Sequence, residues 1–302
     1  MNDDPFLIEG PAVVSFSGGR TSGYMLRRIL DAGLRPDVHV LFCNTGREYE
    51  ETLRFVNDCE RYWGVPIHWL EYDRRYLPAY KSLEVSKIAA RARLASGRQA
   101  CARPRGVREP GYREVTFATA SRRGEPFRNF IEMSGLPNPA TRTCTTELKV
   151  RVMKRWMIAR GYRRWDSVIG IRADEPRRIA KLSKRPPERW TNVMPLARAR
   201  VTENDVLAFW REQSFDLGLA FDPVLGTYRG NCDGCVLKAT DKLLRIEREE
   251  PGRLAWWEDA ERDTESAFRR DRHGYARLRV LAPTLETCGV DDDLGSCTTC
   301  TD

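Results

Sequence analysis

Histidine is scarce in this chain of 302 residues, which has only His39, His68 and His273. None of the three stands beside a recognisable motif, so the sequence argues against histidine acid–base catalysis. No apolar run reaches the length of about 18 residues that a membrane-spanning helix needs. The first five residues are acidic where a signal peptide would be basic and then apolar. These absences predict a globular, cytoplasmic protein that does not contact a membrane.

Cysteine and arginine, by contrast, are plentiful. Nine cysteines without an export signal favour metal ligation or redox chemistry over structural disulfides. The formal net charge is +8, and arginines gather in clusters such as the one between Arg91 and Arg113. Phosphates are the natural partners of such clusters, although an arginine-rich solvated surface would look the same. The length and the 41% hydrophobic content suit one large or two modest domains.

The first 200 residues alternate between strand and helix patterns. Continuous apolar runs, typical of buried parallel strands, occur at residues 13–16, 38–43, 66–71 and 167–171. Helical periodicity follows at residues 23–32, 50–63 and 145–160. The alternation predicts an α/β fold with a doubly wound parallel sheet, Rossmann-like and right-handed in its crossovers. A short last strand, or its exit, is expected at residues 193–196.

Two segments depart from this alternation. Residues 73–143 are rich in glycine, proline and arginine, and we expect them to form a basic insertion within a first domain of residues 1–200. From residue 201 the periodicity is helical, which predicts a helical C-terminal region over residues 201–302, with helices near 203–213, 238–250 and 253–268. The tail from about Leu285 lacks apolar periodicity and contains three cysteines.

A glycine-rich stretch, Ser17-Gly18-Gly19-Arg20-Thr21-Ser22, connects the first strand to the first helix. The glycine pair allows successive backbone N–H groups to face one concavity, and the helix N-terminus adds its positive dipole end. With the hydroxyl groups and the planar guanidinium of Arg20, the stretch predicts a phosphate or sulfate site, the alternative being a plain turn. In a parallel sheet, Asn44-Thr45-Gly46 after the second strand lies at the same edge.

These motifs together resemble the PP-loop adenine nucleotide hydrolases and, within them, the phosphoadenosine phosphosulfate (PAPS) reductase-like family. The resemblance rests on residues 17–22, on Phe42 to Gly46 with Glu48, and on Gly170-Ile171-Arg172. The segments around Cys144 and around Cys232 and Cys235 look like a group found in phages, prophages and mobile-element or CRISPR-associated loci. The resemblance implies that the chain binds an adenine nucleotide, ATP or PAPS, with Mg²⁺ expected beside ATP.

The resemblance also implies roles for individual residues. Catalytic roles fall to Arg20, Arg172 and Asp174: Arg172 would reach a phosphate or sulfate, and Asp174 or Glu175 would hold Mg²⁺. Helix capping, or pairing with the arginines that follow, is the competing role for these two carboxylates. The implied nucleotide-binding set is Ser15, Ser17, Gly18, Gly19, Arg20, Thr21, Ser22, Cys43, Asn44, Thr45, Gly46, Gly170 and Arg172.

The cysteines point to a second site. Cys232-x2-Cys235 alone fits a zinc half-site, a redox pair or a coincidence. A likeness to the iron–sulfur sulfonucleotide reductases adds Cys144 and implies a 4Fe-4S cluster, with zinc as the alternative. Thr145 stands where those enzymes have a further cysteine, so the fourth ligand is Cys300, Cys297 or none. Cys43 and Cys59 are expected in the core, Cys101 is unassigned, and Cys288 is a weaker candidate for a nucleophile.

The function implied is that of an ATP pyrophosphatase, which cleaves ATP to AMP and pyrophosphate and activates a substrate for sulfur transfer. The implied partners are a sulfur donor or thiol reductant and, through the basic insertion, a nucleic acid; oligomerisation is left open. Thiol-dependent reduction of PAPS or APS to sulfite is one alternative. The other is a non-catalytic nucleotide-binding component of a phage or defence complex.

Overall fold

A computed structural model describes residues 4–74, 111–184, 188–219, 222, 226–230 and 232–283. Its centre is a sheet of six strands in the order β4-β3-β2-β1-β5-β6. The strands are β1 (Ala12–Phe16), β2 (Val38–Asn44), β3 (Ile67–Tyr72), β4 (Tyr112–Val115), β5 (Trp165–Ile169) and β6 (Trp190–Val193). Every neighbouring pair is parallel except β3 with β4. The predicted α/β, Rossmann-like sheet is confirmed.

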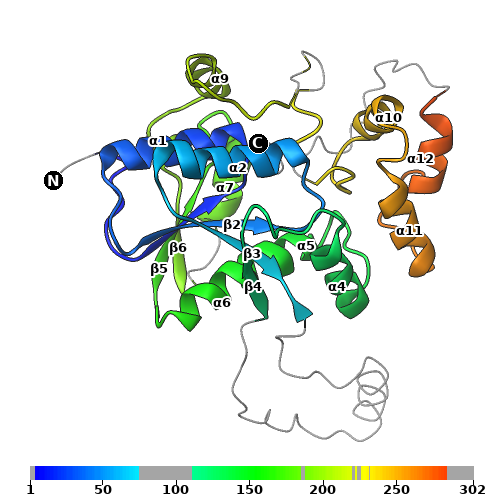
Figure 1. Cartoon of the computed structure of the whole chain (residues 1–302), viewed down its shortest axis with the longest axis horizontal. Helices are drawn as coiled ribbons and strands as arrows, with labels where there is room; N and C mark the ends of the chain where they lie inside the picture. The colour runs from blue at the N-terminus through cyan, green and yellow to red at the C-terminus, as the bar shows by residue number, and fades with distance from the viewer. Residues whose placement is uncertain are drawn as a thin grey trace, which may run out of the picture.

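Helices cover both faces of the sheet (Figure 1). On one side lie α1 (Arg20–Ala32) and α2 (Glu50–Trp63), with α9 (Glu203–Arg211) beyond them; α6 (Arg151–Ala159) lies on the other side. The remaining helices are α4 (Glu125–Ser134), α5 (Thr143–Thr145), the π-helix η2 (Thr146–Val150), α7 (Pro176–Ser183), α8 (Pro195–Arg198), α10 (Thr240–Glu249), α11 (Ala255–Asp263) and α12 (Tyr275–Leu281). Figure 1 shows α10, α11 and α12 grouped together, which confirms a helical C-terminal region.

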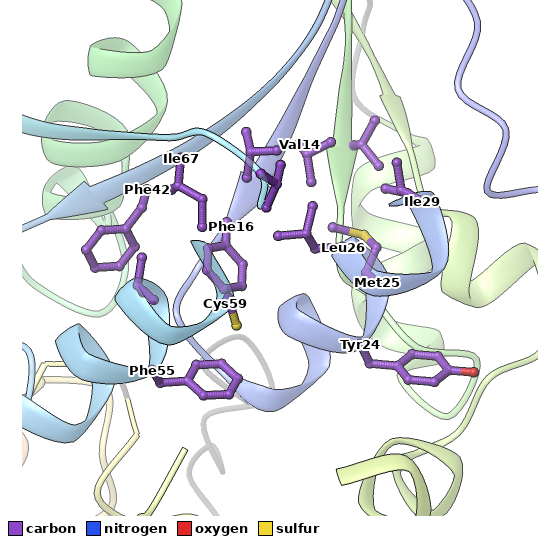
Figure 2. Close-up of a cluster of buried hydrophobic side chains, with 14 of the residues drawn as sticks. Val14, Phe16, Tyr24, Met25, Leu26, Ile29, Phe42, Phe55, Cys59 and Ile67 are labelled. Carbon is purple, nitrogen blue, oxygen red and sulfur yellow. The ribbon is translucent and has the colours of Figure 1, made fainter. Parts of the chain in front are cut away.

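Strand β1 supplies two hydrophobic cores because successive side chains point to opposite faces. Val14 and Phe16 face α1 and α2, where they pack with Leu26 and Phe55 (Figure 2). Val13 faces the other way and belongs to a second cluster. That cluster joins residues of α6, including Val152 and Trp156, with Leu243, Trp257 and Leu278 of α10, α11 and α12. The C-terminal helices therefore share a core with one face of the sheet.

Several expected boundaries were wrong. The expected insertion contains β4, which runs antiparallel to β3 at the edge of the sheet. Of the two possibilities for residues 193–196, the exit of the last strand is the one observed: β6 ends at Val193, since Pro195 cannot donate a ladder hydrogen bond and instead begins α8. The helix expected over residues 253–268 is the shorter α11, and α12 was not foreseen. Among the residues described, no helix has the length and apolar character needed to cross a bilayer.

Four of the nine cysteines lie outside the described residues. They are Cys101 within the expected insertion and Cys288, Cys297 and Cys300 in the tail.

Candidate functional site

The glycine loop between β1 and α1 lies at the carboxyl edge of the sheet, next to the point where the strand order reverses. Gly18 has a φ of 81°, and a Cβ there would lie 2.7 Å from Cγ2 of Thr52, so the position requires glycine. Ser22 Oγ accepts the backbone N–H groups of Ser17 (3.2 Å) and Gly19 (3.3 Å). If a phosphate binds here, the backbone N–H groups of Ser17 and Gly19 donate to it instead of to the Ser22 hydroxyl, or to both.

The two predicted arginines lie in different surroundings. Arg20 donates its Nε to Asp216 (2.8 Å) and its Nη2 to the carbonyl of Leu219 (3.1 Å), so it fastens α1 to the segment after α9. Arg172, only 5% exposed, donates its Nη1 to Thr21 Oγ1 (3.2 Å). Arg172 therefore hydrogen-bonds a hydroxyl group in the first turn of α1, directly after the glycine pair.

The carboxylates after β5 make capping and pairing contacts. Asp174 accepts Nε of Arg172 (2.9 Å) and the backbone N–H of Glu203 (2.9 Å) at the start of α9. Glu175 accepts the backbone N–H of Arg172 (2.9 Å) and pairs with Arg178. These contacts are of the capping and pairing kind considered as the competing role, and Mg²⁺ binding by Asp174 or Glu175 stays a prediction. Asp174 nevertheless stays next to the loop through its contact with Arg172.

The Asn44-Thr45-Gly46 edge is fixed by a buried carboxylate. Glu71, with 0% exposure, accepts Nδ2 of Asn44 (2.6 Å), the backbone N–H of Ser121 (2.6 Å) and the guanidinium of Arg113 (2.9 Å). Asn44 Oδ1 in turn accepts the N–H of Gly46 (2.9 Å). The sequence analysis missed Glu71; its signal was a carboxylate next to the last residue of a mostly apolar strand.

Two predicted nucleotide-binding residues face α6 and η2. The hydroxyl of Ser15 lies 3.7 Å from the sulfur of Met153, and the thiol of Cys43 lies 3.8 Å from the carbonyl of Lys149. Burial raises the pKa of Cys43 to about 12. Gly170 is closer to the loop, since a Cβ there would lie 3.5 Å from the Cα of Ser22.

The loop at residues 232–238, which carries Cys232 and Cys235 and is called the cysteine loop below, contacts the Asn44-Thr45-Gly46 edge, called the nucleotide edge below. Thr45 Oγ1 lies 2.9 Å from Oε2 of Glu48 and 3.4 Å from the sulfur of Cys232. Glu48 and Cys232 also pair in an isolated antiparallel bridge, and Lys149 Nζ lies 3.9 Å from the Glu48 carboxylate. The two predicted half-sites are thus in direct contact.

Asp233, 1% exposed, holds the cysteine loop in this position. Its backbone N–H donates to the carbonyl of Arg47 (2.8 Å), and its carboxylate accepts Nε1 of Trp257 (2.8 Å) and pairs with the Arg47 guanidinium. Burial raises the pKa of Asp233, and Arg47 opposes that shift. Lys238 is buried and donates to the carbonyls of Tyr228 (2.8 Å) and Gly230. It therefore holds the backbone that precedes the cysteine loop in place.

The three predicted cysteine ligands lie in one neighbourhood. Burial raises the pKa of Cys232, with Glu48 adding to the shift. Burial also raises the pKa of Cys144, and nearby Cys235 contributes there as it does at Cys232. Across the described ranges, however, no group of three or more His, Cys, Asp or Glu side chains is arranged to hold a metal ion. Thiol chemistry suits iron–sulfur or zinc, but the ligand set is not preformed there.

A π-helical turn, η2, follows α5, the short helix that contains Cys144. Such turns are rare and often occur at functional sites. This one supplies the Lys149 carbonyl that lies beside Cys43, and it carries the Lys149 ammonium near Glu48. The sequence contained no signal for it, because the periodicity of residues 145–160 resembles that of an ordinary helix.

Comparison with known proteins connects this geometry to a family. The model of the phosphoadenosine phosphosulfate reductase domain matches residues 11–104. The chain is 30% identical over 248 residues to the uncharacterized nin region protein ORF290 of Escherichia phage lambda, a match that covers 80% of this chain and 70% of the phage protein. The chain belongs to the PAPS reductase-like family.

A shorter match, 47% identical over 60 residues, links this PAPS reductase-like chain to the uncharacterized protein MJ0066 of Methanocaldococcus jannaschii. It covers 20% of this chain and 12% of that protein. The family model includes the glycine loop and β1, β2 and β3 but none of Cys144, Cys232 and Cys235. Family membership therefore accounts for an adenine nucleotide site and the PP-loop enzyme class, and the phage relative fits the predicted phage group.

Proposed function

We propose that this chain binds ATP, cleaves it at the α-phosphate to AMP and pyrophosphate, and activates a substrate for sulfur transfer. One observation carries the proposal: Thr45 Oγ1 at the nucleotide edge lies 3.4 Å from the sulfur of Cys232. Because the two sites touch, a substrate activated at one lies close to the sulfur chemistry of the other.

In this proposal, the loop at residues 17–22 binds the phosphates, Thr45 and Gly46 face the adenosine, and Asp174 holds Mg²⁺ once the nucleotide is bound. A nucleophile of the substrate forms a bond to the α-phosphorus, the bond to the bridging oxygen breaks, and pyrophosphate leaves with the electron pair. Arg172 stabilises the negative charge that develops on that leaving group. A hydrosulfide donor then forms a bond to the substrate atom that carries the AMP group, and AMP leaves with the electron pair of the broken bond.

The proposed cofactor is a 4Fe-4S cluster held by Cys144, Cys232 and Cys235, with Cys300 as fourth ligand; Cys297 as that ligand and zinc as the metal are the alternatives. Three thiols gathered from two segments support this assignment. If neither tail cysteine binds, three protein ligands leave one iron open, and that iron would supply a place for the incoming sulfide. Burial raises the pKa of Cys144 and of Cys232, and the charge of Lys149 opposes that rise at both. Lys149 would therefore offset negative charge on these sulfur atoms.

A second candidate is the reduction of PAPS or APS to sulfite by a thiol reductant. The observation that favours it is the match of residues 11–104 to the PAPS reductase domain. The third, a nucleotide-binding component without turnover, would bind ATP and convert neither nucleotide.

Product analysis separates these functions. Iron-reconstituted protein is incubated anaerobically with labelled ATP and, separately, with PAPS and a thioredoxin-type reductant. We expect AMP and pyrophosphate in the first reaction and no sulfite in the second. Arg172→Ala should lower AMP formation by about 100-fold, as loss of one transition-state donor does. Arg54→Ala, an exposed arginine on α2, serves as the matched control. Sulfite without AMP would overturn the proposal.

The metal assignment has its own test. Cys144→Ser and Cys232→Ser should each lower bound iron and its visible absorbance, whereas Cys59→Ala in the apolar core should not. A colourless protein that contains only zinc would overturn the iron assignment.

A further inference from the structure

A recess of about 370 Å³ lies beside both halves of the site, and its lining comes from the loop after β2 and from the connection between α10 and α11. It is lined by Arg47, Glu250, Pro251, Gly252, Arg253 and Trp256. Arg47 directly follows Gly46 of the nucleotide edge and pairs with Asp233, the neighbour of Cys232. The volume falls within the range of small-molecule pockets. The proposed cleavage of ATP makes no use of this recess.

Two guanidinium groups of the lining are held in fixed orientations. Arg47 binds Asp233 through its Nε and Nη2, and Arg253 binds Glu250 through the same two atoms. Within the part of the chain that the structure describes, neither Nη1 atom donates a hydrogen bond; Arg253 Nη1 lies 3.8 Å from Asp233. Each Nη1 has two N–H donors, so the recess presents oriented cationic donors that suit a phosphate.

The same recess has an aromatic wall. Trp256 is half-buried, and the guanidinium carbons of Arg47 and Arg128 lie 5.1 Å and 5.2 Å from its ring centroid. An indole beside oriented guanidinium groups is the combination that binds a nucleobase together with its phosphate. A site for a bare anion would not need the indole.

Basic residues continue beyond the rim of the recess. A Cβ on Gly124 would lie 2.7 Å from Trp256 Nε1 and 2.8 Å from Arg47 Cδ, so the start of α4 borders the recess. Arg123, whose side chain is 89% exposed, and Arg128 flank this border. Arg123 pairs with Glu125 and Arg128 pairs with Asp263, so both guanidinium groups are held outside the recess, where a polymer has further phosphates and a mononucleotide has none.

We propose that the recess binds one nucleotide unit of a single-stranded nucleic acid, with its phosphate on Arg47 and Arg253 and its base against Trp256. A single strand is required because a base that is stacked and paired in a duplex cannot enter a recess. A free mononucleotide has the same chemistry and is the other source that the test must separate. The role of the strand as sulfur acceptor rests on the proposed function, whereas its binding does not.

The binding test uses fluorescence anisotropy of labelled 12-nucleotide single strands of RNA and DNA with the full-length chain. Arg253→Ala and Trp256→Ala should each weaken binding by about tenfold, the loss expected for one stacked base or one phosphate contact. Trp256→Phe keeps a ring and should recover most of the affinity, which a general folding defect would not allow. Arg54→Ala on α2 and Trp190→Ala on β6, outside the recess, are the controls.

Competition and turnover decide the remaining outcomes. AMP should displace the strand at lower concentration than inorganic phosphate does; equal potency would overturn the role of the indole. Binding of AMP that depends on Trp256, without binding of either strand, would overturn the polymer assignment. Unchanged affinity in both recess variants would overturn the site.

Turnover separates this inference from the proposed function. If the strand binds but no AMP forms from ATP, the proposed function fails and the recess assignment stands. If AMP forms but no strand binds, the recess assignment fails and the proposed function stands.

Discussion

The two sides of this site are assembled in different ways. The nucleotide side is local: Ser17, Gly19 and Ser22, which hold the loop together, lie within six consecutive residues. The cysteine side is long-range, because Thr45 and Cys232, whose side chains touch, are 187 positions apart in the chain. A local motif keeps its geometry wherever the strand and helix form. The cysteine loop takes its position only when the whole chain has folded, so changes on the two sides should have separable effects.

Paired glycine substitutions give the largest expected effects. Gly18→Ala adds a methyl group 2.7 Å from Thr52 at a φ of 81°, and should lower the free energy of unfolding by about 3 kcal/mol and abolish ATP binding. Gly234→Ala places its methyl group 2.3 Å from Trp257 and should cost about 2 to 3 kcal/mol through overpacking, while ATP binding survives. Urea unfolding and calorimetric titration with ATP measure the two quantities.

Gly64→Ala is the control for this pair. Its φ is +61°, yet nothing lies within 4 Å of the added methyl group, so backbone strain alone should cost about 1 kcal/mol. Loss of ATP binding in Gly234→Ala to the same extent as in Gly18→Ala would show that the two sides form one cooperative unit, against the separation argued above.

Asp233→Asn breaks the connection between the sides. The change keeps the shape of the side chain but removes the charge that pairs with Arg47, so we expect a loss of about 2 kcal/mol in unfolding free energy. Amide hydrogen exchange should accelerate across residues 232–238 and remain slow in β1 and β2. Faster exchange throughout the sheet would contradict a local effect.

The difference between the sides also explains what the sequence could predict. Glycines and apolar runs specify the loop at residues 17–22 and the parallel strands β1, β2, β3 and β5, and all of these were foreseen. Strand β4 was not, because its four residues include Arg113 and Glu114 and it becomes a strand only by pairing with β3, about 40 residues earlier. Asp216, the partner of Arg20, lies 196 positions away and has no local signal. Residue types thus indicated the chemistry, and distant pairings decided which side chains meet.

Substitution of Glu71 tests whether the nucleotide side depends only on contacts within its loop or also on contacts between distant parts of the chain. Glu71→Gln removes the charge that binds Arg113 and weakens the support of Asn44, so we expect a loss of about 2 kcal/mol and weaker ATP binding. Glu114→Gln, whose carboxylate forms half-exposed pairs with Arg160 and His68, should cost less than about 1 kcal/mol. Equal losses in urea unfolding would mean that the buried network adds nothing beyond a surface pair.

Thiol labelling compares the two sides within one sample. Burial raises the pKa of Cys43 to about 12, so at pH 8 about one thiol in ten thousand is ionised, and iodoacetamide should label it far more slowly than in the unfolded chain. Cys232, whose pKa is also raised by burial, should be protected in the same way in metal-free, reduced protein.

The Asp233→Asn variant then separates the two thiols. Once the cysteine loop loses its pairing with Arg47, Cys232 should gain solvent access and label faster. Cys43 is held by the pairing of β2 with β1 and β3 and not by Asp233, so its labelling rate should not change. Peptide mapping by mass spectrometry measures both rates in the same digest. If both thiols accelerate together, the cysteine loop and the sheet open as a single unit, and the independence of the two sides is lost.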